Sequence, residues 1–176
     1  MRFSIIGNSG SGKSFLAQKL MATGFGPIFE TDELMFGENW SATPVARYRQ
    51  LHDALIAQKE WRIAGIDYPD ATLRRIAASS HIVLVDIPLW QIYANVTRRQ
   101  IEWLKTPYLT SNQKDPPDTD RLAKIIWEVD QEVMPLFRSA IHQAATRGAR
   151  VAWLRDREAI SRVKTIADLF TAPPSC

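Results

Sequence analysis

The eight residues Gly-Asn-Ser-Gly-Ser-Gly-Lys-Ser, at Gly7–Ser14, limit the possible folds of this chain more than any other part of its sequence. The apolar, β-forming stretch Phe3–Ile6 precedes them, and Phe15–Leu20 then repeats apolar residues at the spacing of a helix. We therefore expect a buried strand, a glycine turn and a helix in direct succession. This order of elements is typical of α/β domains with a parallel sheet.

The same eight residues match the pattern G-x-x-x-x-G-K-[ST], which binds phosphate groups. Its glycines let the backbone N–H groups wrap around a phosphate, and the following helix adds its positive N-terminal end. Lys13 is expected to contact the β- and γ-phosphates, and Ser14 to ligate Mg²⁺. The pattern therefore predicts binding of ATP, or another nucleoside triphosphate, together with Mg²⁺. The candidate binding residues of this loop are Asn8, Ser9, Gly10, Ser11, Gly12, Lys13, Ser14 and Phe15.

Strand and helix patterns alternate along the rest of the chain. The clearest strand contains the continuous apolar run Ile82–Val85, which is typical of a strand covered on both faces. That strand is expected at His81–Ile87, further strands at Ile28–Glu30, Trp61–Gly65 and Val151–Leu154, and helices at 44–59, 70–78, 88–104, 120–145 and 158–170. The helix at 120–145 is expected to be disturbed at Pro135. The alternation predicts an α/β fold, with helices on both faces of a parallel sheet, in one domain over residues 1–176.

Composition narrows the class of protein. The chain has 176 residues, of which 45% are hydrophobic, so it can bury a sizeable core. Its net charge of +3 attracts DNA only weakly, and it has no basic recognition helix, so nucleic acid is not an expected partner. Cys176 is the only cysteine, and no apolar run approaches the ~20 residues of a membrane span. The apolar stretch near Met1 is too short for a signal peptide, so we expect a cytoplasmic protein without a membrane partner.

Carboxylates and arginines elsewhere are candidates for phosphoryl transfer, which depends on positioning and charge neutralisation. Asp32 follows the second expected strand, where it could orient an acceptor hydroxyl, hold Mg²⁺ through water, or cap the turn that follows. Asp86 ends the clearest strand, where it could contact a Mg²⁺-bound water or cap the next helix. Arg98 and Arg99 lie on the helix that enters the proline-rich segment 105–119, a candidate lid, so one of them could reach the γ-phosphate.

Short strings spread over nearly the whole chain form a further pattern. They are Ile5–Ala17, Thr31–Leu34, Trp40, Pro44, Glu60-Trp61, Val83–Pro88, Trp90, Arg98-Arg99, Trp127 and Leu154-Arg155. In these strings the chain resembles the topology modulation proteins, a family of small bacterial P-loop proteins that are similar to adenylate kinase. The resemblance implies a three-layer P-loop NTPase fold, with a five-stranded parallel sheet in the order 2-3-1-4-5 and a lid at residues 105–119. It also implies an adenine site near Arg155–Glu158, and a phosphate contact from Arg99 in the lid helix.

Three positions depart from that family's pattern. Ala64 stands where such proteins commonly carry an acid, and Asn95 stands where relatives often carry an arginine. The stretch Glu128–Glu132 is acidic, although the helix after the lid is usually rich in arginine on its catalytic side. Arginines there would stabilise charge on the transferred phosphoryl group, and Arg121 or Arg138 could replace them.

These features predict a P-loop kinase that transfers the γ-phosphate of ATP to a small molecule or a nucleotide. The expected catalytic residues are Lys13, Asp32 and Arg99, and the expected further nucleotide contacts are Arg98 and Arg155. The acceptor is expected to bind at the segment 36–70 and the lid, with Trp40 as a candidate lining residue. The three departures leave a second function open, a nucleotide-binding regulator with little or no kinase activity. Either could be a monomer or a homodimer.

Overall fold

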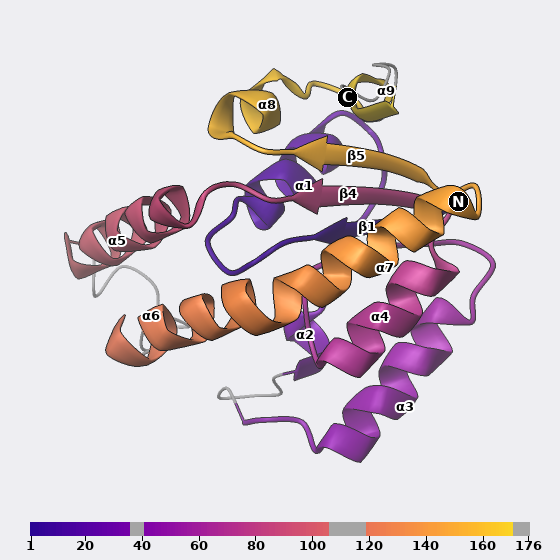
Figure 1. The fold of residues 1–176 in the computed structure, drawn as a ribbon, viewed down its shortest axis with the longest axis horizontal. Helices are drawn as coiled ribbons and strands as arrows, with labels where there is room; N and C mark the ends of the chain where they lie inside the picture. Colours follow the sequence, from indigo (N-terminus) through magenta and orange to yellow (C-terminus); the bar gives the residue numbers. More distant parts are fainter. Residues whose placement is uncertain (36–40, 106–118, 171–176) are drawn as a thin grey trace.

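The computed structural model describes residues 1–35, 41–105 and 119–170, and its five strands all run parallel in one sheet (Figure 1). The strands are β1 (Arg2–Ile6), β2 (Phe29–Glu30), β3 (Trp61–Ala64), β4 (His81–Val85) and β5 (Arg150–Leu154). They lie in the order β2-β3-β1-β4-β5, which confirms the P-loop NTPase fold with strand order 2-3-1-4-5. Every expected strand is present, within two residues of its expected bounds.

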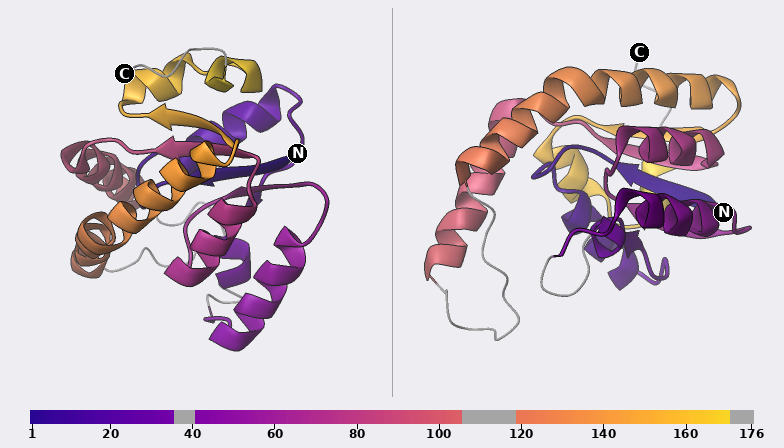
Figure 2. Two further views of the ribbon diagram at one scale, coloured as in Figure 1. Left: turned by 45° about the vertical axis from the view of Figure 1, so that its right-hand side comes forward. Right: turned by 90° about the horizontal axis from the view of Figure 1, so that it is seen from below.

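Helices cover both faces of this sheet (Figure 2). Their bounds are α1 (Lys13–Ala22), α2 (Asp32–Met35), α3 (Val45–Ile56), α4 (Pro69–Ala78), α5 (Leu89–Lys105), α6 (Thr119–Glu128), η2 (Val129–Val133), α7 (Met134–Thr146), α8 (Arg157–Arg162) and α9 (Ile166–Phe170). Successive residues of a strand face opposite sides of a sheet. On β4, Ile82 and Leu84 therefore pack with α4 and α7, whereas Val83 and Val85 pack with α1, α5 and α8.

The carboxyl ends of the strands meet at one edge of the sheet, because all the strands are parallel. Gly7 follows β1 at this edge, and Glu30 is the last residue of β2. Gly65, Asp86 and Arg155 directly follow β3, β4 and β5. In open parallel sheets, ligands bind in the crevice outside this edge. The fold thus brings together segments that are up to about 150 residues apart in the sequence.

The helix expected after the lid divides into three parts. α6 passes into the π-helix η2 and then into α7 as one continuous run that bends along its length (Figure 2). Pro135 explains the change, because it lacks an N–H group and its ring crowds the carbonyl group four residues earlier. The wider π turn at Val129–Val133 relieves this conflict before Pro135 is reached. The disturbance therefore precedes the proline, whereas the sequence pattern predicted it at the proline itself.

Two other helices differ from expectation. The expected helix 158–170 is two helices, because Val163 is extended and a new helix begins at Ile166. Asp168, in the first turn of this helix, accepts hydrogen bonds from the backbone N–H groups of Lys164 and Thr165. α3 begins at Val45, with Pro44 as its N-cap residue, so it is shorter than the expected 44–59.

Some expectations fall outside the described residues. The expected lid at 105–119 is described only at its two ends, and Trp40 is not described. Within residues 1–35, 41–105 and 119–170, no helix is long and apolar enough to cross a membrane.

Candidate functional site

The loop after β1 turns sharply into α1 and is held by its own backbone. Gly12, the residue before α1, has φ of 103°, a left-handed conformation that residues with a side chain rarely adopt. The Ser11 N–H donates to the Asn8 carbonyl oxygen at 3.2 Å, and the Lys13 ammonium donates to the same oxygen at 2.8 Å. Strand, loop and helix therefore follow one another as predicted, with the Lys13 side chain folded back over the loop.

Two amide side chains anchor this loop to neighbouring helices. Asn8 Nδ2 donates to the Ile126 carbonyl oxygen of α6 at 2.8 Å, and Asn8 Oδ1 accepts from the Ser9 N–H at 2.7 Å. Asn95 Nδ2, on α5, donates to the Gly10 carbonyl oxygen at 2.9 Å. The Asn8 side chain is buried and engaged in shaping the loop. Asn95, which the sequence analysis gave as a departure from the family's pattern, has a comparable task.

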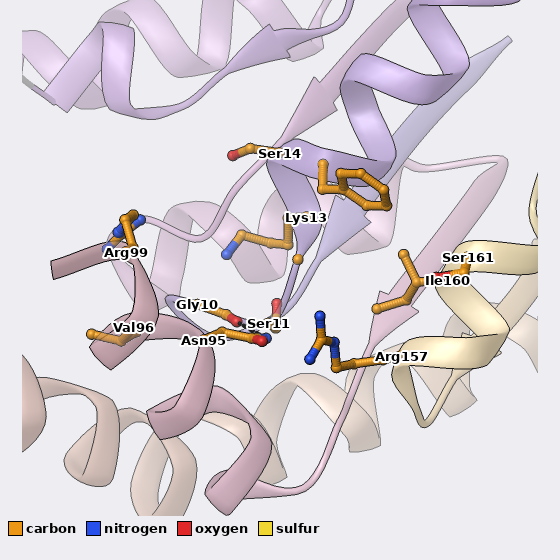
Figure 3. A pocket seen from close by; sticks show the side chains of 12 residues that line it. Gly10, Ser11, Lys13, Ser14, Asn95, Val96, Arg99, Arg157, Ile160 and Ser161 are labelled. Atoms are coloured by element: carbon orange, nitrogen blue, oxygen red, sulfur yellow. Dashed lines mark hydrogen bonds between the residues drawn. The ribbon is translucent and has the colours of Figure 1, made fainter. Parts of the chain in front are cut away.

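A hollow of about 350 Å³ opens above the loop. The loop contributes Gly10 to Ser14 and the neighbouring Phe15, and α5 contributes Asn95, Val96 and Arg99. α8 contributes Arg157, Ile160 and Ser161. Figure 3 shows Arg99 and Arg157 on opposite sides of Lys13. Three cations and no carboxylate line this hollow among the described residues, which gives it the charge that a polyphosphate requires.

The surroundings of Lys13 shift its pKa in both directions. Burial of its ammonium group lowers the pKa of Lys13 to about 8, and the cations Arg99 and Arg75 act in the same direction. The carboxylates of Asp32 and Glu30 oppose that shift. Burial costs the ammonium group its water, and the added negative charge of a bound phosphate would repay part of that cost. The sequence predicted a phosphate contact for Lys13, and this environment suits one.

Ser14 is joined to a carboxylate that the sequence interpretation did not include. Ser14 Oγ donates a hydrogen bond to Glu30 Oε2 at 3.1 Å. A serine hydroxyl and one carboxylate suit Mg²⁺, which binds oxygen ligands and commonly uses one or two carboxylates together with substrate phosphates. Within the described residues, no group of three or more His, Cys, Asp and Glu side chains is placed to hold a metal ion.

The remaining predicted residues lie outside the hollow. Asp32 is the first residue of α2 and is exposed, within electrostatic range of Lys13. Arg98 is exposed on α5 and does not line the hollow, although its neighbour Arg99 does. Asn8 and Ser9 are part of the loop but also do not line the hollow. Their proposed contacts to nucleotide or metal stay predictions.

A second hollow, of about 380 Å³, holds Asp86 and Arg155 together with Asp130 of η2 and Arg138 of α7. Arg138 donates to both carboxylate oxygens of Asp86, at 2.9 and 2.8 Å, and lies 3.9 Å from Asp130. Trp153 Nε1 donates to Asp86 Oδ2 at 3.2 Å, and the Arg155 guanidinium stacks over the Trp153 ring. The pKa of Arg138 is raised, mainly by its hydrogen bonds to Asp86. The Asp86 carboxylate is thus already paired.

The sequence interpretation missed two residues of the site, Glu30 and Arg157. Glu30 ends an expected strand two residues before Asp32, so the convergence of strand ends was a sufficient signal for it. Arg157 lies two residues after Arg155, in the segment that the family resemblance gave as an adenine site. Nothing in the sequence pattern distinguishes these two arginines.

Comparisons with known proteins give the fold. The sequence matches no known protein family and no curated protein. Its structure is similar to that of a shikimate kinase from Acinetobacter baumannii in complex with shikimate, with a TM-score of 0.52 and 13% sequence identity, over 82% of this chain and 89% of the other. A gluconokinase from Sinorhizobium meliloti 1021 also matches, with a TM-score of 0.39 and 17% identity over 82% of this chain and 95% of the other. The likeness to the shikimate kinase, at 13% identity, shows a shared fold only.

Proposed function

We propose that this chain is a P-loop kinase that transfers the γ-phosphoryl group of ATP to a small molecule or a nucleotide. One observation carries the proposal. The phosphate loop forms the floor of a hollow in which Lys13, Arg99 and Arg157 face the same space without a lining carboxylate. An excess of fixed positive charge has a use when a ligand brings several negative charges to it.

Each cation has a distinct place around such a ligand. Lys13 extends from the loop itself and would bind the β- and γ-phosphates. Arg99 comes from the helix that enters the expected lid, and it would neutralise charge on the transferred group. Arg157 begins α8, next to Ile160 and Ser161, and these residues would bind the sugar or base.

Mg²⁺ would be held by the Ser14 hydroxyl, with the Glu30 carboxylate beside it. The oxygen donors of these two side chains fit this ion. Bound there, Mg²⁺ would supply positive charge to the phosphate oxygens. Asp32, close to the same edge of the sheet, would orient the acceptor hydroxyl and accept its proton. A new P–O bond then forms to the acceptor oxygen, while the bond from the γ-phosphorus to the bridging oxygen breaks and ADP leaves.

A small acceptor is part of this proposal. The chain shares its fold with a kinase whose structure was determined with shikimate, which is compatible with an acceptor of that size. Membership of the topology modulation proteins, which the sequence resemblance suggests, is also part of the proposal.

The second candidate is a nucleotide-binding regulator with little turnover, and two observations favour it. Asn95 holds the Gly10 carbonyl group at a position where an arginine would add charge. Arg138, which could have replaced such an arginine, binds Asp86 in the other hollow. Arg99 and Arg157 are then the only arginines that line the phosphate hollow in the described parts of the chain.

Two measurements separate these functions. The first is the affinity of the wild-type protein for ATP and ADP with Mg²⁺, and the second is steady-state release of ADP with a panel of small hydroxylated acceptors and nucleoside monophosphates. We expect nucleotide binding and acceptor-dependent ADP release. Binding without release for any acceptor would favour the regulator, and the absence of both would contradict both functions.

A further inference from the structure

Arg75 of α4 is a completely buried cation outside the phosphate hollow. Its Nη2 donates to the Gly65 carbonyl oxygen at 2.6 Å, and its Nη1 lies 3.4 Å from Asp67 Oδ2. Nε and Nη1 have no hydrogen-bond partner among the described residues. Burial lowers the pKa of Arg75, and the Asp67 carboxylate opposes this shift. The shortest contact of this guanidinium is therefore to a backbone carbonyl group and not to its carboxylate neighbour.

Asp67 connects Arg75 to two helices. The Thr72 hydroxyl, on α4, donates to Asp67 Oδ1, and His52 Nε2, on α3, lies 3.8 Å from Asp67 Oδ2. The side chains of His52, Asp67 and Arg75 are all fully buried. Figure 1 shows α3 and α4 side by side, and the two helices contact each other. This buried polar cluster joins both helices to the segment that follows β3.

Stability alone does not explain a cation at this position. Removing a guanidinium from water costs several kcal/mol, and an ion pair repays this cost only with excellent geometry. The pairing of Arg75 with Asp67 is loose at 3.4 Å, and two of its three side-chain nitrogens have no hydrogen-bond partner among the described residues. Apolar side chains of similar volume often replace buried ion pairs without loss of stability. The position of the Gly65 carbonyl group is what this arginine fixes most closely.

Gly65 in turn determines where Thr31 lies. Gly65 has φ of 127°, and a Cβ atom built on it would collide with Thr31 Oγ1. The Thr31 N–H donates to the Ala64 carbonyl oxygen at 2.9 Å, so the backbone holds Thr31 against the end of β3 as well. Thr31 Oγ1 is buried and has no hydrogen-bond partner among the described residues. Thr31 is therefore packed directly on the glycine whose carbonyl group Arg75 holds.

Thr31 lies between the two carboxylates of the candidate site. Glu30 precedes it and accepts the hydrogen bond from Ser14 Oγ, and Asp32 follows it. A shift of Gly65 would reach Thr31 first and the two flanking carboxylates next. A chain of direct contacts thus runs from Arg75 through Gly65 and Thr31 to the proposed metal ligands.

We infer that Arg75 is a positioning residue for the metal site: it fixes Gly65, Gly65 fixes Thr31, and Thr31 places Glu30 beside Ser14. The inference rests on the proposed function, because it assigns Mg²⁺ to Ser14 and Glu30. Residues outside the direct ligands of a metal affect its affinity through the ligands they orient, typically by ~10–100-fold.

The test compares Arg75→Met and Arg75→Lys with the control Arg74→Met. Arg74 is the preceding residue on α4, and it binds Asp70 and Asp53 at the surface. Three quantities are measured for each protein: the free energy of unfolding in urea, the dissociation constant for ADP in the presence of a chelator, and the Mg²⁺ concentration that gives half of the metal-dependent gain in ADP affinity.

For Arg75→Met we expect metal-free ADP affinity within about twofold of wild type and a Mg²⁺ requirement raised by about tenfold. Arg75→Lys keeps the cation and should recover part of the loss, and Arg74→Met should keep the wild-type Mg²⁺ requirement. A folded Arg75→Met protein with the wild-type Mg²⁺ requirement would overturn the inference.

If Arg75→Met does not fold, Thr31→Ala makes the same test from the other end of the contact chain. It removes the hydroxyl and methyl groups that pack on Gly65 and leaves Glu30 and Asp32 in the sequence. A raised Mg²⁺ requirement with unchanged metal-free ADP affinity supports the inference, and an unchanged requirement overturns it. Failure of the proposed function would look different, because the wild-type protein itself would then bind no ADP with or without Mg²⁺.

Discussion

Two hollows lie at the carboxyl edge of the same sheet, and basic side chains line both, but only in one of them are these side chains paired with carboxylates. The hollow above the phosphate loop is lined by Lys13, Arg99 and Arg157 and by no carboxylate among the described residues. The other hollow sets Arg138 against Asp86, with a hydrogen bond to each carboxylate oxygen. We call the cations of the first hollow unmatched, because the nearby carboxylates of Asp32 and Glu30 do not line it, whereas in the second hollow the positive charge is largely neutralised.

This difference shows how to distinguish a charged side chain that is available to a ligand from one that stabilises the fold. A matched pair such as Arg138 and Asp86 fixes α7 to the end of β4 and leaves little field for a ligand. An unmatched group such as Lys13 has a lowered pKa, because the protein buries it without a carboxylate hydrogen-bond partner, and a bound anion would relieve that cost. Residue type and distance from the sheet edge do not make this distinction, but the partners of each cation do.

Lys13→Met should have the largest effect. Loss of this cation removes the contact to the β- and γ-phosphates, so we expect affinity for ATP with Mg²⁺ to fall by about 100-fold or more. Arg138→Met is the matched control from the second hollow. It should keep ATP affinity within about twofold and lower the free energy of unfolding by about 1–2 kcal/mol, because its pair is partly exposed. Calorimetric titration and urea unfolding measure both. Equal losses of affinity in the two variants would break the comparison.

Arg99→Met against Arg98→Met is the next test. These residues are neighbours on α5, but only Arg99 lines the phosphate hollow. We expect Arg99→Met to lower kcat by about tenfold or more, with a smaller change in KM for ATP, because this contact strengthens as charge moves during transfer. Arg98→Met should stay within about twofold in both. If Arg98→Met lost more activity than Arg99→Met, the hollow would not mark the catalytic arginine.

Much of the fold could be predicted from the sequence, because its signals are local or backbone-based. The glycines and Lys13 at Gly7–Ser14 identify the loop wherever they occur between a strand and a helix. The buried run in β4 shows a strand covered on both faces. The strand order came from the family resemblance, and the structure confirms it.

The site was harder to predict, because side-chain direction depends on where elements begin. α8 begins at Arg157, after Asp156 caps it by accepting a hydrogen bond from the Ala159 N–H. Arg155 therefore stacks on Trp153, and Arg157 faces the hollow. A shift of one residue in that cap would change which arginine is used, and no sequence pattern fixes a helix start so closely.

Arg75 shows the same limit within a helix. The pair Arg74-Arg75 is an ordinary basic pair in the sequence. Only the folded structure distinguishes the two: Arg75 points inward to the Gly65 carbonyl oxygen and is fully buried, while Arg74 stays at the surface.

Arg157→Ala against Arg155→Ala compares the two hollows directly, with a smaller expected effect. Arg157 would contact the sugar or base and not the transferred phosphate, so we expect its loss to weaken ADP binding by about fivefold. Arg155→Ala should change ADP affinity by less than twofold, because that side chain lies in the second hollow. Titration of both variants with ADP and Mg²⁺ decides between them. A larger effect at Arg155 would instead support the adenine site that the family resemblance implied.

Proton uptake on nucleotide binding is the smallest effect and the most specific to the unmatched hollow. Because the pKa of Lys13 is lowered to about 8, half of the free protein carries a neutral amine at that pH. The phosphates of a bound nucleotide favour the ammonium form and raise this pKa, so binding at pH 8 should take up about half a proton. The uptake should decline toward pH 6, where the amine is already protonated. Binding enthalpies measured in buffers of different ionisation enthalpy give the number of protons directly.

Lys13→Arg provides the control, because an arginine stays charged throughout this range and should remove the uptake while keeping a cation in place. Equal uptake in both proteins would show that another group titrates, and the contrast between an unmatched and a matched cation would then lose its clearest consequence.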